Sequence, residues 1–540
     1  MATSKTLIHL LDTNTVPSNV EAASIEQSIA KYDIEIATCE IEIAKLRSQL
    51  DALVEQRRRH NAVLSPLRRM PLELLGEIFA MVPLYILDQR GRQDVINLGL
   101  VCKRWRDTTI YTHRLWSSVA LSPHDGLKAY DKTVSWFEKS GGVPKSLEFS
   151  AWMHCGCSDG GDYRCLATNP ALTRLLTEGP VLDHFTLIVS RTACFKNWIA
   201  AIDAAEKVPG KPRPWDALRS FDLTFNEDRR DRWGELEHDI PEQWCFSLLP
   251  PAITALHLYL PGAWAGFGED EGLSRHGALK IPVEVLNRLI TFTIKCDWSG
   301  TKLVELLHHC TNVETLTIKF NDGSPLLEER DNPLLHTLAK SRILLPKVRS
   351  LRLREAGTAE ILRYLSTPAI TNLDLGFADW GAEDDDFVDI VPKFLHASDA
   401  TTSLLSLRIY NLHIAGYDLR QSLDGLDSLK RLTLDKVTWS GNLFIAMKNS
   451  DHKCKPRIPS VEQLEILQFP DDRGILPIGS GALMEGIRQG CMPCTLTMSI
   501  RGAHSQTWPF FTGESRRTWR EKAFMYVQTV PPLNWECLQV

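Results

Sequence analysis

One short apolar pattern recurs through most of this 540-residue chain. Each copy holds an apolar residue, two others, a second apolar residue, one other, and a third apolar residue. Successive copies begin 22 to 38 residues apart, which leaves room for a strand, a turn and a returning helix. The copies are Leu182-Phe185-Leu187, Leu218-Phe221-Leu223, Ile253-Leu256-Leu258, Leu289-Phe292-Ile294, Val313-Leu316-Ile318, Val348-Leu351-Leu353, Ile370-Leu373-Leu375, Leu404-Leu407-Ile409, Leu429-Leu432-Leu434 and Val461-Leu464-Ile466, with Trp116-Val119-Leu121 and Pro144-Leu147-Phe149 before them. Stacked units of this kind bury their apolar residues against their neighbours, so the pattern predicts an elongated array of parallel strands.

This repeat resembles the strand signature of leucine-rich repeats. Residues 303–310 and 361–365 have helical apolar spacing between the strands, so we expect a helical outer layer. The resemblance implies a curved solenoid over 122–500, with 501–540 as a C-terminal cap or tail. A doubly wound α/β sheet is the competing fold, but its Gly-rich turn after an early strand is not found in the sequence.

A heptad pattern occupies residues 20–64. Apolar residues fill every core position: Ala22, Ile25, Ile29, Tyr32, Ile36, Cys39, Ile43, Leu46, Leu50 and Leu53. The segment contains no Pro or Gly before Ser65-Pro66, so we expect one helix of about 60 Å that ends there. It either packs onto its own chain or forms a coiled coil with a second copy or a partner, and the pattern fits both. Residues 1–19 are expected to be disordered.

The apolar spacing within residues 65–121 predicts three short helices. Pro71 precedes an amphipathic segment that ends at Phe79, and a second helix carries Val95 to Trp105. A third helix is expected over 107–114. Helices this small expose apolar surface that must be covered by another part of the chain or by another protein, which predicts a docking module.

Met70-Pro71, Ile78-Phe79, the run Val101-Cys102-Lys103-Arg104-Trp105 and Leu115-Trp116 together resemble an F-box. The family usually opens on Leu-Pro and has a shorter loop between its first two helices. The resemblance implies that this segment contacts a Skp-family adaptor through Met70, Pro71, Leu74, Leu75, Ile78, Phe79, Val101, Cys102 and Trp105, although Trp105 fits an internal core position equally well. The order of heptad helix, F-box and repeats is similar to a family of fungal F-box proteins.

The repeats also predict a binding face. If the apolar residues of each strand point into the core, the alternate side chains line the opposite, concave side. These residues are His257, Tyr259, Lys295, Lys319, Arg352, Arg354, Arg408 and Tyr410. Basic and aromatic groups predominate among them, which favours an acidic or phosphorylated peptide. The alternative is that they only make the surface soluble.

Three further clusters contain side chains that could bind a metal ion or undergo redox chemistry. His154, Cys155, Cys157 and Cys165 are candidate zinc ligands, but their spacing fits no zinc motif, and a Gly-containing loop is the preferred interpretation. Cys491 and Cys494 have redox spacing without a thioredoxin-like context, and 383–386 is an acidic turn rather than a calcium loop. No nucleophile elbow, phosphate loop or zinc-protease motif occurs, so we expect no enzyme activity, no metal and no cofactor.

Composition limits the setting and the partners. Charged residues make up 24% of the chain and the net charge is −6, which indicates neither a nucleic-acid partner nor a membrane surface. Thirteen scattered cysteines, no Asn-x-Ser/Thr sequon and no secretory pattern in residues 1–11 favour the cytoplasm or nucleus.

The sequence therefore predicts an α/β protein: a long N-terminal helix and a three-helix F-box followed by a curved leucine-rich-repeat solenoid. The implied function is substrate recognition in a Skp-cullin-F-box ubiquitin ligase, with an unidentified protein substrate on the repeats and a cullin reached through the adaptor. The alternative is a repeat scaffold that binds partners, or forms a homodimer through the heptad helix, without directing ubiquitination. A cryptic enzyme is the third choice.

Overall fold

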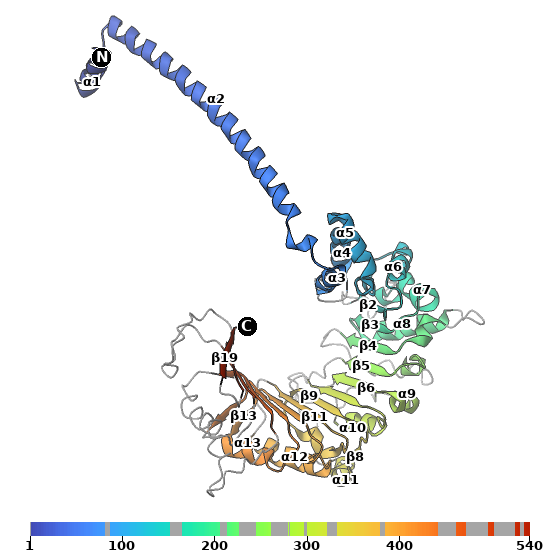
Figure 1. Cartoon of the computed structure of the whole chain (residues 1–540). Helices are drawn as coiled ribbons and strands as arrows, with labels where there is room; N and C mark the ends of the chain where they lie inside the picture. Colours follow the sequence, from blue (N-terminus) through green and yellow to red (C-terminus); the bar gives the residue numbers. More distant parts are fainter. Residues whose placement is uncertain are drawn as a thin grey trace, which may run out of the picture. The chain divides into compact units, whose positions relative to one another are not determined.

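The computed structural model describes residues 2–13, 15–81, 87–151, 165–205, 213–225, 245–260, 279, 281–295, 300–320, 332–378, 384–440, 461–470, 495–501, 524–529 and 534–539. The chain forms two compact units, Met1–Val82 and Pro83–Val540. Together they make a mixed helix and sheet protein (Figure 1). Among the described helices, none combines the length and the apolar character that crossing a membrane requires.

The first unit is helical. It contains α1 (Ala2–Thr13), α2 (Asn19–Val63), the 3-10 turn η1 (Pro66–Arg68) and α3 (Leu72–Met81). The predicted long helix is confirmed to within a residue at each end. A capping box starts it, because the Ser18 hydroxyl accepts from the Glu21 amide and the Glu21 carboxylate accepts from the Ser18 amide. Helix α1 lies where disorder was expected; residues 2–13 contain no Gly or Pro to interrupt it.

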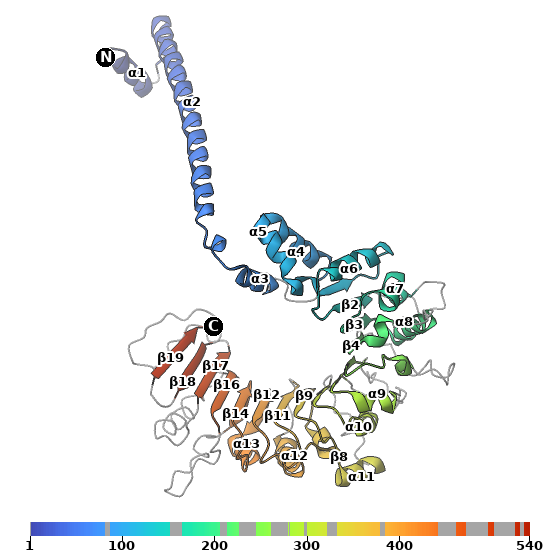
Figure 2. The ribbon, with the colours of Figure 1, turned by 45° about the vertical axis from the view of Figure 1, so that its right-hand side comes forward.

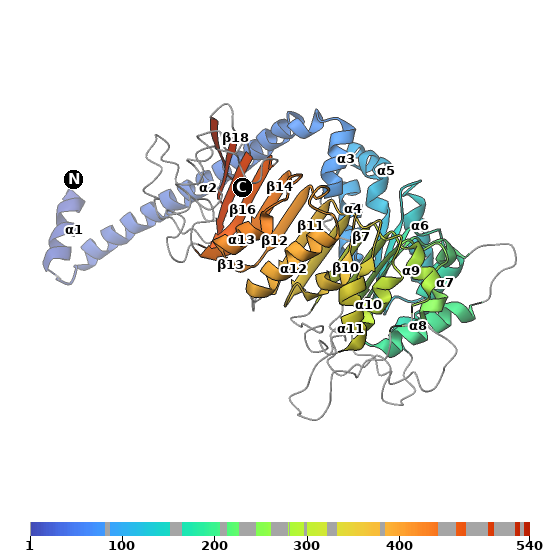
Figure 3. The same cartoon turned by 90° about the horizontal axis from the view of Figure 1, so that it is seen from below.

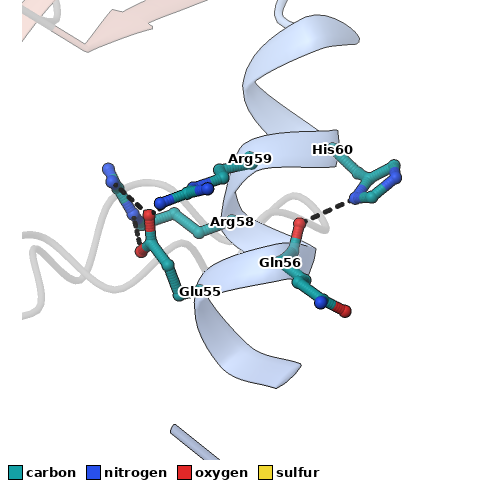
Figure 4. A network of polar contacts seen from close by, with 5 residues as sticks. All are labelled: Glu55, Gln56, Arg58, Arg59 and His60. Carbon is teal, nitrogen blue, oxygen red and sulfur yellow. Dashed lines mark hydrogen bonds and ion pairs between the residues drawn. The ribbon is translucent and has the colours of Figure 1, made fainter. Parts of the chain in front are cut away.

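The last turns of α2 carry an exposed charge cluster. Arg58 donates to both oxygens of Glu55 at 2.7 and 3.0 Å, and Arg59 donates to the same carboxylate at 2.9 Å (Figure 4). These hydrogen bonds, that of Arg58 first, lower the pKa of Glu55 to about 2. All three side chains are open to solvent, so the cluster is a solvated helix end.

The second unit is built on a 15-stranded sheet whose strand order follows the chain, β1-β2-β3-β4-β5-β6-β7-β9-β11-β12-β14-β16-β17-β18-β19. The strands are β1 (Ser118–Leu121), β2 (Ser146–Ala151), β3 (His184–Val189), β4 (Ser220–Phe225), β5 (Ala255–Tyr259), β6 (Thr291–Lys295), β7 (Thr315–Lys319), β9 (Ser350–Ala356), β11 (Asn372–Phe377), β12 (Ser406–Tyr410), β14 (Arg431–Asp435), β16 (Gln463–Pro470), β17 (Thr495–Arg501), β18 (Phe524–Thr529) and β19 (Asn534–Gln539). Neighbours are parallel as far as β17, and β18 and β19 add antiparallel strands within the predicted cap or tail. The order never reverses among the described strands, unlike that of a doubly wound sheet.

Helices cover the outer side of the curved sheet (Figures 2 and 3). They are α6 (Lys128–Glu138), α7 (Pro170–Glu178), α8 (Thr192–Ala204), α9 (Val283–Arg288), α10 (Gly300–His308), α11 (Pro333–Ser341), α12 (Asp384–Ala397) and α13 (Gly416–Leu423). The same layer holds the short parallel pairs β8 (Ile343–Leu344) with β10 (Leu365–Ser366) and β13 (His413–Ala415) with β15 (Thr438–Ser440). The 3-10 turns of this unit are η2 (His113–Trp116), η3 (Leu166–Thr168), η4 (Pro214–Ala217), η5 (Cys245–Leu248) and η6 (Glu360–Tyr364).

The outer layer is only partly helical where helices were expected. Helix α10 confirms the prediction over 303–310. Residues 361–364 form part of the 3-10 helix η6 rather than an α-helix, and Leu365 begins β10.

The repeated apolar residues form the core between strands and helices. Every Leu, Ile, Val, Phe and Trp of the recurring pattern is at most 5% exposed, from Trp116 to Ile466. The strands alternate buried and more open positions, as in β5 and β7. The predicted strand positions and their inward side chains are therefore confirmed.

Several strands end on a left-handed residue. Glu355, Asn411, Lys436 and Gln468 have φ between 49° and 57°, and each follows the last apolar residue of its pattern by two positions. In β9 and β16 this residue accompanies a register shift against the neighbouring strand, as in a β-bulge. At Asn411 and Lys436 the strand has just ended, whereas beyond Glu355 and Gln468 pairing resumes in a shifted register.

Asn411 provides a test of this conformation. Its side-chain amide donates to the Phe377 and Ala378 carbonyl oxygens at 3.1 and 2.8 Å. Asn411→Ala should lower the free energy of unfolding by about 2 kcal/mol, since it removes two hydrogen bonds and replaces Asn, which tolerates left-handed backbone, with a residue that does not. Asn411→Gly should cost about half as much, because Gly adopts left-handed backbone without strain and only the hydrogen bonds are lost. Urea unfolding measures both, and equal losses would contradict a conformational role.

Candidate functional site

The part of the predicted docking region that belongs to the second unit contains two helices that fold back on each other. They are α4 (Gln89–Val101) and α5 (Lys103–Tyr111), and Cys102 between them is extended, with φ −163° and ψ 168°. The single helix predicted over Val95 to Trp105 was therefore wrong. The break allows close packing: a β-carbon on Gly99 would lie 3.3 Å from the Thr109 hydroxyl, and Thr108 and Thr109 are buried.

This helical pair is fastened to the first strand of the sheet. Arg92 donates from Nη1 to the Leu87 and Ala120 carbonyl oxygens at 3.2 and 2.6 Å, and burial lowers its pKa. Trp116 donates from Nε1 to the Thr109 carbonyl oxygen at 2.7 Å, and its ring lies 4.5 Å from that of Trp136. These contacts hold α4 and α5 on a rigid base.

Apolar side chains remain exposed on α4 and α5. Leu100 is 67% exposed, Val101 60% and Tyr111 75%, and Ile96 and Ile110 are also open to solvent. Ile96 and Leu100 lie one helical turn apart, on one face of α4. Of this group, only Val101 was predicted to contact an adaptor. The i, i+4 spacing of Ile96 and Leu100 could have identified these two residues of α4 as part of the same exposed face. Exposed apolar groups gathered on two short helices are typical of a protein-binding surface.

Helix α3, in the first unit, carries two apolar stripes. Leu75 and Phe79 are 1% and 2% exposed, whereas Leu74 and Ile78 are 56% and 42% exposed. Both pairs have i, i+4 spacing, so the stripes lie side by side on the helix. One stripe supports the fold and the other is open to a partner.

The predicted adaptor residues therefore separate by exposure. Exposed positions are Pro71, Leu74, Ile78, Val101 and Cys102; half-buried positions are Met70 and Trp105; buried positions are Leu75 and Phe79. Trp105 lies on α5 and makes a contact within the chain, and its role at an adaptor stays a prediction. The exposed residues are the ones that can touch another protein.

The predicted substrate-binding residues lie on one face of the sheet, in two rows set by the strand register. His257, Arg352 and Arg408 belong to a first row that also contains Thr317 and Asp374. Tyr259, Lys295, Lys319 and Arg354 are neighbours in the second row, which Tyr410 continues on β12. All eight are exposed or half-buried, as the alternation predicts. Their role in binding stays a prediction.

Acidic neighbours neutralise several of these cations. Lys319 lies 3.0 Å from the Glu355 carboxylate and Arg354 binds Asp374 at 2.5 Å. The expected basic strip is therefore a mixed-charge face. The pairing itself was not predicted, because contacts between strands depend on register, which single repeats do not display.

Arg408 is the centre of this network. It lies 2.6 Å from Asp435 and 3.7 Å from Asp374. Burial works against its charge, but the hydrogen bond to Asp435 and the two carboxylates outweigh it, so the pKa of Arg408 is raised. Arg408 is therefore a fixed structural cation between two strands, already occupied by carboxylates.

Gly376 on β11 makes room for the ion pair between Arg354 and Asp374. A β-carbon on Gly376 would lie 3.2 Å from the Leu353 carbonyl oxygen and 3.5 Å from Nη1 of Arg354. The bare backbone of β11 therefore lets the guanidinium lie over it and reach Asp374. Any side chain at this position would crowd the network.

A second acid lies at the other end of the strip. Asp222 on β4 is 3.8 Å from Nε2 of His257. Burial raises the pKa of Asp222, opposed by the charges of His257 and His184. This end of the face therefore carries an acidic group beside His257 and does not favour an anionic ligand.

A hollow of about 510 Å³ opens on the same face, over β9, β11, β12, β14 and β16. Charged residues in its lining are Arg352, Asp374, Arg408, Arg431 and Glu465. Arg352 has no hydrogen bond or ion pair with any residue that the structure describes. Arg431 donates only to the Gln463 amide oxygen, at 2.9 Å, within the same ranges. Arg431 was missed because it precedes the middle apolar residue of its repeat.

The other candidate clusters lie mostly outside the described residues. Cys155, Cys157, His154, Cys491 and Cys494 fall there, and Cys165 is half-buried. Within the described ranges, no group of three or more His, Cys, Asp or Glu side chains is arranged to hold a metal ion.

Comparison with known proteins identifies one region. The family model described as F-box-like matches residues 67–122. These bounds agree closely with the predicted 65–121 and include α3, α4, α5, η2 and β1. No curated protein matches the chain.

Proposed function

We propose that this protein is the substrate-recognition subunit of a Skp-cullin-F-box ubiquitin ligase. The observation that carries the proposal is the F-box-like match over 67–122, because F-box domains generally bind Skp-type adaptors. In this account the F-box-like region docks the adaptor, the adaptor brings a cullin, and the sheet face holds a protein substrate.

Exposed apolar side chains support the docking step. Leu74 and Ile78 on α3, and Leu100, Val101 and Tyr111 on α4 and α5, would each lose contact with water on binding. Large apolar anchors of this type carry most of the binding energy in protein interfaces. The first contacts to test are therefore these residues rather than the buried Leu75 and Phe79.

We also propose that the second unit is a leucine-rich-repeat array of the kind found in fungal F-box proteins. Three features support this assignment: the recurring buried apolar pattern, the strand order that follows the chain and the helices on the outer side of the sheet. Such arrays bind ligands on an extended concave surface.

In this role the protein needs no catalytic group of its own. Ubiquitin is transferred by other subunits, and the chain positions the substrate. The proposed location is the cytoplasm or nucleus, where the adaptor and cullin would be available.

Purification of the tagged full chain tests the proposal. The expected result is co-purification of a Skp-family adaptor and a cullin, together with ubiquitin transfer to a co-purified protein when the remaining ligase subunits are added. An adaptor without a cullin would favour a scaffold that does not direct ubiquitination. Recovery of neither would contradict the proposal.

The heptad helix supports a scaffold as the second candidate function. No residue of α2 is buried, and its core positions Ile36, Ile43 and Leu46 are 55%, 47% and 54% exposed. Ile29, Ile36 and Ile43 occupy a positions and Leu46 and Leu53 occupy d positions, a combination that favours two-stranded coiled coils. We propose that the chain forms a homodimer through this seam.

Sedimentation of two variants tests the homodimer. Ile36→Asp with Ile43→Asp places charges in the seam and should lower the self-association constant more than about 100-fold. Ile34→Asp with Ile41→Asp, outside the seam, introduces the same charges on the same helix and should leave the dimer intact. A monomeric wild-type chain, or equal effects of both variants, would contradict dimerisation through the seam.

A further inference from the structure

The arginines in and beside the hollow over β9 to β16 are of two kinds: those paired with a carboxylate and those without such a partner among the described residues. Arg408 is occupied by Asp374 and Asp435, and Arg354 beside the hollow is occupied by Asp374. Arg352 and Arg431 face the hollow without a carboxylate partner among the described residues. An anionic ligand would therefore meet two separate guanidinium groups rather than a continuous basic strip.

The register fixes how far apart these two arginines lie. Ser350 on β9 pairs with Asn372 on β11, which pairs with Ser406 on β12, which pairs with Arg431 on β14. Three strand spacings place Arg431 about 14 Å from Ser350 across the sheet. Arg352 lies two residues, or about 7 Å, further along β9, and both side chains are long enough to lean toward the hollow.

These two offsets separate the backbone positions of Arg352 and Arg431 by about 16 Å, and side chains that lean inward bring their guanidinium groups closer together. Residues i and i+4 of a strand point to the same side and lie about 13 Å apart. Between the two arginines, Ser350, Asn372 and Ser406 line the hollow beside the paired Asp374 and Arg408, and they offer neutral donors and acceptors for a peptide backbone. Guanidinium groups bind carboxylate and phosphate through paired hydrogen bonds.

We propose that the hollow binds an extended peptide carrying two anionic side chains four residues apart, one on Arg352 and the other on Arg431. This inference rests on the proposed function, since it assigns the substrate class of the same sheet face. Phosphorylated residues bind more tightly than Glu at these two positions, because each phosphate carries more charge and a third acceptor oxygen.

Fluorescence anisotropy with the full chain tests the proposal. The probes are short synthetic peptides with two phosphoserines placed two, four or eight residues apart, the matching Glu peptides and the unmodified parent. The four-residue spacing should bind most tightly, with Glu weaker and the parent weakest. Eight residues span about 26 Å and reach only one arginine. Equal binding at all spacings would overturn the proposal.

Single variants assign the contacts. Arg352→Gln and Arg431→Gln should each weaken binding of the four-residue phosphopeptide about tenfold. Arg349→Gln is the matched control, because Arg349 is exposed beside the same strand but does not line the hollow. Unchanged binding for either hollow variant, or an equal loss for the control, would overturn the assignment.

The same variants separate this inference from the ligase role. Adaptor capture should be unchanged by Arg352→Gln and Arg431→Gln, whose thermal unfolding should match that of the wild type. Adaptor capture without peptide discrimination would leave the proposed function standing and remove the substrate class. Peptide discrimination without adaptor capture would remove only the ligase role.

Discussion

Leu74→Asp with Ile78→Lys should abolish capture of a Skp-family adaptor while the fold remains intact. Both side chains are exposed, at 56% and 42%, so their replacement removes contact surface rather than core. Asp near the start of α3 and Lys nearer its end suit the helix dipole, and their i, i+4 spacing favours an ion pair. The expected loss is more than about 100-fold in affinity, since two apolar anchors are replaced by charges.

Two comparisons make this result specific. Leu127→Asp with Val181→Lys introduces the same charges at two apolar positions that are each 59% exposed, and should leave capture unchanged. Phe79→Ala should instead reduce stability by about 3–5 kcal/mol, because Phe79 is 2% exposed. Pull-down and thermal unfolding distinguish the two effects, and full capture by the Leu74 and Ile78 variant would exclude this stripe as the docking surface.

The largest stability effect is expected at Trp198. This residue on α8 is fully buried, and its ring lies 5.6 Å from Phe185, 5.9 Å from Phe221 and 5.3 Å from Trp215. The cluster joins β3, β4, α8 and η4. Trp198→Ala should therefore lower the free energy of unfolding by about 3–5 kcal/mol.

Trp198→Phe is the control for this core. Trp198 Nε1 is buried without a hydrogen-bond partner in the described part of the chain. Phenylalanine keeps a stacked ring and removes that polar group, so the loss should stay below about 1.5 kcal/mol. Urea unfolding gives both values, and a similar loss for Ala and Phe would show that ring packing is not the main contribution.

The long-range periodicities were sufficient to predict much of this fold. The heptad pattern predicted α2, because ten uninterrupted core positions without Pro or Gly leave few alternatives. The apolar triads predicted the strands, since alternation decides which side chains point inward. The exposed face of the sheet follows from the same alternation.

Features that depend on contacts between distant residues were not predicted. The turn at Cys102 was missed, because the spacing from Val95 to Trp105 fits one helix as well as two, and only the packing of Gly99 against Thr109 requires the break. The pairing of Arg354 with Asp374 depends on the register of β9 and β11 and on the bare backbone of Gly376. The composition of one repeat does not contain this information.

Titration calorimetry of the full chain with a purified Skp-family adaptor measures docking itself. We expect a one-to-one complex with a dissociation constant below about 1 µM, corresponding to about 8 kcal/mol. We expect no measurable binding by the Leu74→Asp, Ile78→Lys variant. Absence of binding by the folded wild-type chain, or equal binding by the variant, would contradict docking through the F-box-like region.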